Sequence, residues 1–116
     1  MDLIIAMNYG GRREIMHACQ KIAREVLDGK ILPEDISEDS LVGHMYIPEI
    51  PDPDLVIRPS GEQRMSNFLV WEAAYAELWF SNTLWPDFGF DDLTAAFREY
   101  TGRDRRFGGL SKPVNK

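Results

Sequence analysis

The stretch D-L-V-I-R-P-S-G-E-Q-R-M-S-N, residues 54–67, determines how the rest of the chain is interpreted. It opens with a short apolar run, Leu55–Ile57, which predicts a buried strand. The run leads into Arg58 and a P-S-G turn, and the stretch closes with Ser66 and Asn67, two residues typical of helix caps. Strand, polar turn and capped helix in this order predict a ligand-binding loop at the carboxyl end of a parallel strand.

Two arginines in this stretch, Arg58 and Arg64, indicate that the ligand is a phosphate or diphosphate. The guanidinium group presents a rigid fork of donors that matches phosphate oxygens, and free N–H groups at a helix start favour the same ligands. The alternative is that both arginines form surface ion pairs with Glu62 and Asp54, which contribute little to stability. Ser66, taken alone, is more often a helix cap than a ligand.

Composition and charge exclude several classes of function. The 116 residues suffice for one domain, and an apolar content of 44% can fill its core. The net charge of −6 argues against general nucleic-acid binding, which needs a basic face. The single cysteine, Cys19, excludes an internal disulfide and fits a reducing compartment. With no signal-peptide pattern and no apolar run of membrane-spanning length, we expect a cytoplasmic protein.

The remaining segments alternate between strand and helix patterns. Leu3–Met7 is a continuous apolar run, typical of a strand buried on both faces of a parallel sheet. A helix from about Arg12 to Asp28 should end at Gly29. Its predicted buried stripe consists of Ile15, Cys19, Ile22 and Val26. We further expect a short helix over 38–42, a buried helix over 68–75, a strand over 76–80 and a helix from Asp91 to Gly102.

Together these elements predict an α/β fold, with a mostly parallel central sheet flanked by helices. Residues 1–110 are assigned to this single domain, and residues 111–116 are expected to form a disordered tail. The predicted strands are too few to give the sheet covered edges. We therefore expect the chain to hold only part of a larger sheet.

Five short motifs give the chain a resemblance to the cis-prenyltransferases. The likeness extends from Leu3 to about Leu110 and is greatest to bacterial undecaprenyl diphosphate synthase, also called isoprenyl transferase. It implies the sheet architecture of that enzyme, with this chain corresponding to its C-terminal half. The motifs are N-Y-G-G-R at 8–12, R-P-S-G-E-Q-R-M-S-N at 58–67, A-Y-A-E-L-W-F at 74–80, L-W-P-D-F at 84–88 and D-R-R-F-G-G at 104–109.

The resemblance implies a transferase that adds isopentenyl diphosphate to an allylic diphosphate, such as farnesyl diphosphate, with Mg²⁺ as cofactor. The product would be an all-cis polyprenyl diphosphate for the lipid carrier of cell-wall synthesis. The enzyme would be a homodimer, and its lipid product would bring a peripheral membrane contact.

The same resemblance assigns roles to individual residues. Glu77 would hold Mg²⁺, which accepts one or two carboxylates together with phosphate oxygens. The alternative for Glu77 is a salt bridge to an arginine. Arg106 and Gly108 match an R-x-G element that reaches across the dimer into the partner's diphosphate site. The residues that would bind the diphosphate of isopentenyl diphosphate are Arg58, Arg64 and Ser66.

The sequence departs from the family pattern in two respects. Pro59 stands where the family usually has threonine. The D-G-N-G-R-W-A segment, which carries the family's catalytic aspartate, does not occur in these 116 residues, so no catalytic residue is assigned. We therefore expect the chain to supply the isopentenyl diphosphate site and the dimer tail, and to be inactive alone. The alternative is a non-catalytic fragment or partner subunit that completes another chain's diphosphate site.

Overall fold

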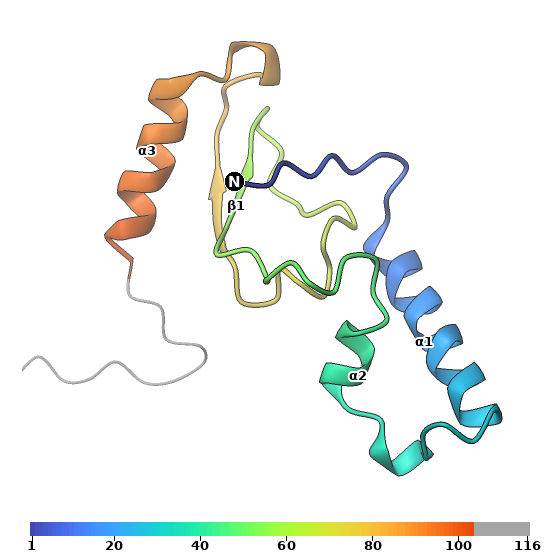
Figure 1. Cartoon of the computed structure of the whole chain (residues 1–116). Coiled ribbons are helices and arrows are strands. Elements are labelled where there is room, and N and C mark those ends of the chain that lie inside the picture. Colours follow the sequence, from blue (N-terminus) through green and yellow to red (C-terminus); the bar gives the residue numbers. More distant parts are fainter. Residues whose placement is uncertain (104–116) are drawn as a thin grey trace, which may run out of the picture. The chain divides into compact units, whose positions relative to one another are not determined.

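The computed structural model describes residues 1–103, which divide into two compact units (Figure 1). The first unit contains Met1–Asp52 and Met65–Ala74, and the second contains Pro53–Arg64 and the chain from Tyr75 onward. In chain order the elements are α1 (Gly11–Leu27), the 3₁₀ turn η1 (Pro33–Asp35), α2 (Glu38–Val42), β1 (Leu55–Arg58), β2 (Glu77–Phe80), the 3₁₀ turn η2 (Trp85–Asp87) and α3 (Phe90–Thr101).

Helix α1, which belongs to the first unit, ends where its sequence predicts. Gly29 follows the last turn with a φ of +72°, a conformation that glycine adopts without steric cost. Its N–H donates to the carbonyl of Val26 at 3.1 Å, and the N–H of Lys30 donates to the carbonyl of Glu25 at 2.9 Å. These two bonds satisfy carbonyls that the helix itself leaves unpaired. The predicted helix and its glycine stop are confirmed.

The beginning of α1 is capped by a residue far away in the sequence. Gly10 precedes the helix and has no side chain to act as a cap, but Asn67 takes over this role. The N–H of Gly11 donates to the backbone carbonyl of Asn67 at 2.7 Å, and the N–H of Arg12 donates to its Oδ1 at 2.9 Å. A Cβ at Gly11 would lie 2.8 Å from the backbone nitrogen of Val70, so this close approach requires glycine.

The helix predicted over 68–75 does not form, and the segment consists of turns instead. Ser66, Asn67 and Leu69 have φ values of 50°, 65° and 48°, in the left-handed region, where a right-handed helix cannot continue. Phe68 and Tyr75 are exposed rather than buried. Because Asn67 is committed to α1, it does not start a helix of its own.

The buried face of α1 is displaced from the predicted stripe. Gly11, Glu14, Ala18 and Ile22 are buried, whereas Cys19 is exposed, so its assignment to the core was wrong. Helix α2 packs against α1, and Ile15 and Val26 of the predicted stripe are half-buried. Helix α2 itself has the predicted bounds and is capped by Ser37, whose Oγ accepts the N–H of Ser40 at 3.2 Å.

The strand predicted over Leu3–Met7 is also wrong for the described chain. These residues form no strand, and Leu3, Ile5 and Met7 each expose more than 70% of their surface. A strand buried on both faces needs hydrogen-bonded neighbours, and the sheet in residues 1–103 has only β1 and β2. Within the same range, no helix is both long enough and apolar enough to cross a membrane.

The second unit contains the sheet, and its α/β character is as predicted. Strands β1 and β2 are parallel, with Leu55 opposite Glu77 and Arg58 opposite Phe80. Helix α3 follows β2 and buries Ala96. The Asp92 carboxylate caps the start of α3 by accepting the N–H of Gly89 at 3.0 Å and the hydroxyl of Thr83 at 2.7 Å.

Candidate functional site

The loop after β1 has a tightly bonded backbone. Ser60 and Gly61 both have a φ of 71°. Their N–H groups donate to the carbonyls of Thr83 and Ser81, each at 2.8 Å, and Ser60 Oγ accepts the N–H of Trp85 at 3.2 Å. These two amides are therefore not free to bind an anion, and residues 68–75 after the loop form turns rather than a helix. The charged donors of the loop are the side chains of Arg58 and Arg64.

The two predicted anion-binding arginines of the second unit differ in their surroundings. Arg58 is the last residue of β1 and is half-buried. Arg64 exposes 68% of its side chain and forms an ion pair with Glu62. Glu62 is thus the local partner of Arg64, as the sequence suggests. The contact is made by Nη2, and most of the Arg64 side chain remains accessible to solvent.

Three further residues were predicted to bind diphosphate. Ser66 belongs to the first unit, where it is exposed and has a φ of 50°. It is not the N-cap of a following helix. Arg106 and Gly108 lie outside the described residues.

Glu77, the predicted metal ligand, is separated from Arg58 by the strand register. Glu77 begins β2 opposite Leu55, whereas Arg58 ends β1 opposite Phe80. Three residues of strand correspond to about 10 Å, and odd and even positions of a strand point to opposite faces of the sheet. Glu77 and Arg58 therefore lie at opposite ends and on opposite faces of the ladder. They would contact different groups of a ligand rather than each other.

Glu77 instead forms the salt bridge to an arginine that the sequence offers as the alternative, and the partner is Arg103, which the sequence did not single out. Arg103 Nη1 donates to Glu77 Oε2 and to the carbonyl of Leu78, both at 2.9 Å. Arg103 Nη2 donates to Glu99 Oε1 at 2.5 Å, and the indole N–H of Trp79 donates to Glu99 Oε2 at 2.9 Å. The Glu99 and Glu77 carboxylates raise the pKa of Arg103, and Arg103 lowers the pKa of Glu99.

The donor set around Glu77 fits Mg²⁺ only in part. Residues 1–103 contain no cluster of three or more His, Cys, Asp or Glu side chains able to hold a metal. Glu77 supplies one carboxylate, whose Oε2 contacts Arg103 at 2.9 Å. Because Mg²⁺ is commonly bound by one or two carboxylates plus substrate phosphates, Glu77 could be one ligand of such an ion.

A second group of ionisable residues, in the first unit, was not singled out from the sequence. Glu14 exposes only 3% of its surface. Its Oε2 accepts the hydroxyl of Tyr9 at 2.5 Å, and its Oε1 accepts the N–H of Tyr46 at 2.8 Å. Burial and, secondarily, the Glu14 bond raise the pKa of Tyr9. Burial also raises the pKa of Glu72, as does its proximity to Glu14. The spacing of Glu14 with Gly11 and Ala18 on one helix face could have indicated its burial.

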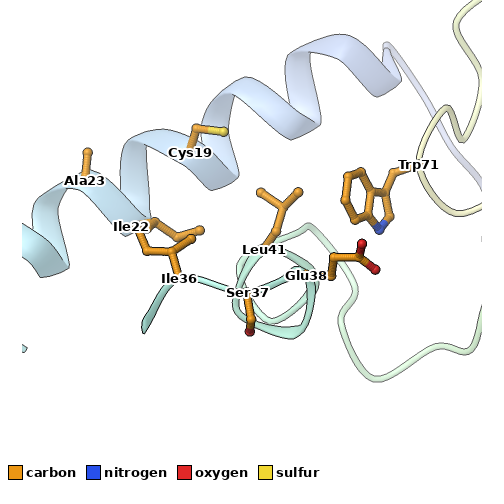
Figure 2. Close-up of a pocket in the computed structure, with 8 residues that line it drawn as sticks. All are labelled: Cys19, Ile22, Ala23, Ile36, Ser37, Glu38, Leu41 and Trp71. Carbon is orange, nitrogen blue, oxygen red and sulfur yellow. The ribbon is translucent and has the colours of Figure 1, made fainter. Parts of the chain in front are cut away.

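An apolar hollow of about 440 Å³ lies between α1 and α2 in the first unit. Figure 2 shows Ile22 and Leu41 projecting into it from the two helices, with the Trp71 indole at one end. Glu38 lies near Trp71, and the exposed Cys19 is part of the wall on the α1 side. With only one charged group in its wall, the hollow suits an apolar occupant.

Comparisons with known proteins identify the family. The family model described as undecaprenyl diphosphate synthase matches residues 1–108. The chain belongs to this family of cis-prenyltransferases. It is 53% identical over 108 residues to an isoprenyl transferase of Heliobacterium mobile, covering 93% of this chain and 42% of that protein. It is 57% identical over 110 residues to an isoprenyl transferase of Bifidobacterium longum, covering 95% of this chain and 42% of that protein.

Solved structures of this cis-prenyltransferase family contain the fold of this chain as part of a longer chain. Lavandulyl diphosphate synthase from Lavandula x intermedia, in complex with dimethylallyl diphosphate, is similar with a TM-score of 0.85 and 43% identity. The match covers 89% of this chain and 44% of that structure. The chain thus spans less than half the length of its relatives. Its correspondence to their C-terminal half remains a prediction from the motifs.

Proposed function

We propose that the chain supplies the isopentenyl diphosphate site of a cis-prenyltransferase. The complete enzyme would join isopentenyl diphosphate to an allylic diphosphate, such as farnesyl diphosphate, and extend an all-cis polyprenyl diphosphate for the cell-wall lipid carrier. The observation that carries this proposal is the R-P-S-G-E-Q-R-M-S-N segment, present in a chain 53% identical to an isoprenyl transferase. Its first arginine stands at the carboxyl end of β1, where α/β sheets bind ligands.

The proposed roles follow from the chemistry of each side chain. Arg58 and Arg64 would neutralise the diphosphate, because the arginine side chain is always positively charged. This local charge is needed because the chain as a whole has a net charge of −6, which repels anions. The Ser66 hydroxyl would donate to a phosphate oxygen. Glu77 would contribute a carboxylate to Mg²⁺, which neutralises the departing diphosphate when bound. In a homodimer, Arg106 and Gly108 would complete the partner's diphosphate site.

One finding supports an allylic diphosphate as the second substrate. The similar lavandulyl diphosphate synthase was solved with dimethylallyl diphosphate, itself an allylic diphosphate. In the proposed reaction the enzyme would contribute positioning and charge stabilisation. The single cysteine is in keeping with a cytoplasmic location for this enzyme.

The proposal is tested by removing one anion-binding arginine. In the complete enzyme, Arg64→Ala should raise the activation free energy measured from kcat/KM for isopentenyl diphosphate by about 2–4 kcal/mol, the typical loss when a bound phosphate covers a contact between charged groups that is exposed in the free chain. Arg98→Ala is the matched control, because Arg98 is an exposed arginine of α3 outside the proposed site. If Arg64→Ala behaves like Arg98→Ala, the assignment of the diphosphate site is refuted.

An activity assay on the 116-residue chain tests whether it holds only part of an active site or a complete one. Incubated with farnesyl diphosphate, isopentenyl diphosphate and Mg²⁺, the chain should form no product, while isopentenyl diphosphate alone should still bind. Robust turnover would show that these residues contain a full active site. Restored turnover on adding a protein that carries the D-G-N-G-R-W-A segment would favour the alternative of a partner subunit.

A further inference from the structure

Arg103 joins the end of α3 to the start of β2. It follows directly after the helix C-cap, Gly102, and its guanidinium contacts both Glu77 and the carbonyl of Leu78. Side chains of Arg103 and Glu77 are only 32% and 26% exposed, so the pair is largely shielded from water. An Arg–carboxylate contact of this kind is directional, because the guanidinium donors lie in one plane.

The guanidinium is itself fixed by a second carboxylate. Glu99, one helical turn before Arg103, accepts Nη2 on one oxygen and the Trp79 indole on the other. Both oxygens of Glu99 therefore accept hydrogen bonds. The contact with Glu99 restricts the orientation of the Arg103 guanidinium plane independently of the contact with Glu77. An exposed ion pair four residues apart on a helix contributes little to stability. Arg103 forms more than such a pair, because it also contacts Glu77 and the carbonyl of Leu78 in β2.

We propose that Arg103 is a positioning residue of the isopentenyl diphosphate site, holding the Glu77 carboxylate by Oε2 and leaving Oε1 directed to a divalent cation. This inference rests on the proposed metal-binding role of Glu77. Groups that orient a metal ligand are often as important to the site as the ligand, and their loss typically weakens binding 10–100-fold.

The first test measures how isopentenyl diphosphate binds to the full chain, with and without Mg²⁺, by calorimetric titration. Arg103→Gln should raise the Kd about tenfold in the presence of Mg²⁺ and change it less than about twofold without the ion. Arg103→Lys should restore part of the affinity, because a lysine keeps the charge but not the two-pronged contact. Arg98→Gln, which alters an exposed arginine of the same helix, should bind like the wild type.

Two results would overturn the inference. Arg103→Gln could bind as tightly as the wild type with Mg²⁺, or it could lose affinity equally with and without the ion, as expected for an arginine that merely stabilises the unit. Glu77→Gln separates these outcomes from failure of the proposed function. If Glu77→Gln leaves Mg²⁺-dependent binding intact, the metal role of Glu77 fails. If Glu77→Gln abolishes that dependence and Arg103→Gln does not weaken it, only the role of Arg103 fails.

A second measurement needs no ligand. In the full chain labelled with ¹³C at glutamate carboxyl carbons, the Glu77 signal is identified by its absence in Glu77→Gln. Arg103→Gln should move this signal towards that of an exposed glutamate, while Arg98→Gln should leave it in place. A Glu77 signal that is the same in Arg103→Gln and in the wild type would overturn the positioning role, whatever the titrations show.

Discussion

Replacing Glu14 by alanine should destabilise the first unit more than any surface change. Glu14 is 3% exposed and accepts two hydrogen bonds, from the Tyr9 hydroxyl and the Tyr46 N–H. Alanine leaves both donors without this acceptor, and each buried donor that loses its partner costs about 1–3 kcal/mol. Tyr9 is only half-buried and Tyr46 is exposed, so water recovers part of the loss. Removing a carboxylate beside Glu72 also relieves repulsion, and we expect a net loss of about 2–4 kcal/mol.

The loss of stability is measurable by urea unfolding of the full chain, followed by circular dichroism. The change would be a large fraction of the roughly 5–15 kcal/mol by which domains are stable. Glu14→Gln keeps an acceptor oxygen and should lose less stability than Glu14→Ala. Glu49→Ala, at an exposed glutamate, should stay within about 0.5 kcal/mol of the wild type. A Glu14→Ala variant as stable as Glu49→Ala would refute the buried-acceptor argument.

Three further predictions concern the same fold. The pKa of Glu72 is raised above 4.5, so its protonated form stabilises the folded state. This contribution to the free energy of unfolding is fully present below pH 4.5 and is lost as the pH rises through the folded-state pKa. Glu72→Gln, which mimics the protonated acid, should flatten this fall in denaturation profiles. Gly11→Ala should cost about 1–3 kcal/mol through the clash with Val70, whereas Gly102→Ala, with contacts no closer than 3.5 Å, should be tolerated in thermal melts. Hydrogen bonds from Thr83 and the Gly89 N–H lower the pKa of Asp92. The ionised carboxylate therefore stabilises the folded state, and this effect should disappear as the pH falls through the folded-state pKa. Asp92→Ala should lower the melting temperature at neutral pH but not at acid pH.

The elements with local signals were predictable from the sequence. Helix α1 has a 3.6-residue pattern and a glycine stop, and α3 has acidic residues in its first turn and Gly102 after its last. Helix α2 begins after a serine whose side chain caps it, and β2 is a compact apolar run. Each of these signals depends on a few neighbouring residues, so the element can be predicted without knowing which distant residues it contacts.

The features that were mispredicted depend on distant partners. Leu3–Met7 has the composition of a buried strand but finds no strand to pair with among residues 1–103. Asn67 was predicted to cap a helix and does cap one, but the helix is α1, 55 residues earlier, and not the segment that follows it. The predicted helix over 68–75 also failed, since Asn67 contacts Gly11 and Arg12 and the backbone at Asn67 and Leu69 is in the left-handed region.

The candidate site was predictable in its residue types but not in its contacts. Arg58, Arg64 and Glu77 stand out as charged residues next to strands, yet only the strand register shows that Arg58 and Glu77 lie at opposite ends of the ladder. The Arg103 partner of Glu77 comes from the far end of α3, 26 residues away. No local pattern in the sequence connects the two.

The remote cap of α1 has a consequence for how the first unit opens. The first turn cannot complete its bonding until a loop of 55 residues has closed, which costs about 3.5 kcal/mol of chain entropy beyond a constant. The amide hydrogens of Gly11 and Arg12 are then shielded from solvent only while the segment containing Asn67 stays docked. They should exchange with deuterium together, at a rate set by undocking rather than by fraying of the helix end. The exchange rates of these two adjacent amides would thus report how often the contact with Asn67 opens.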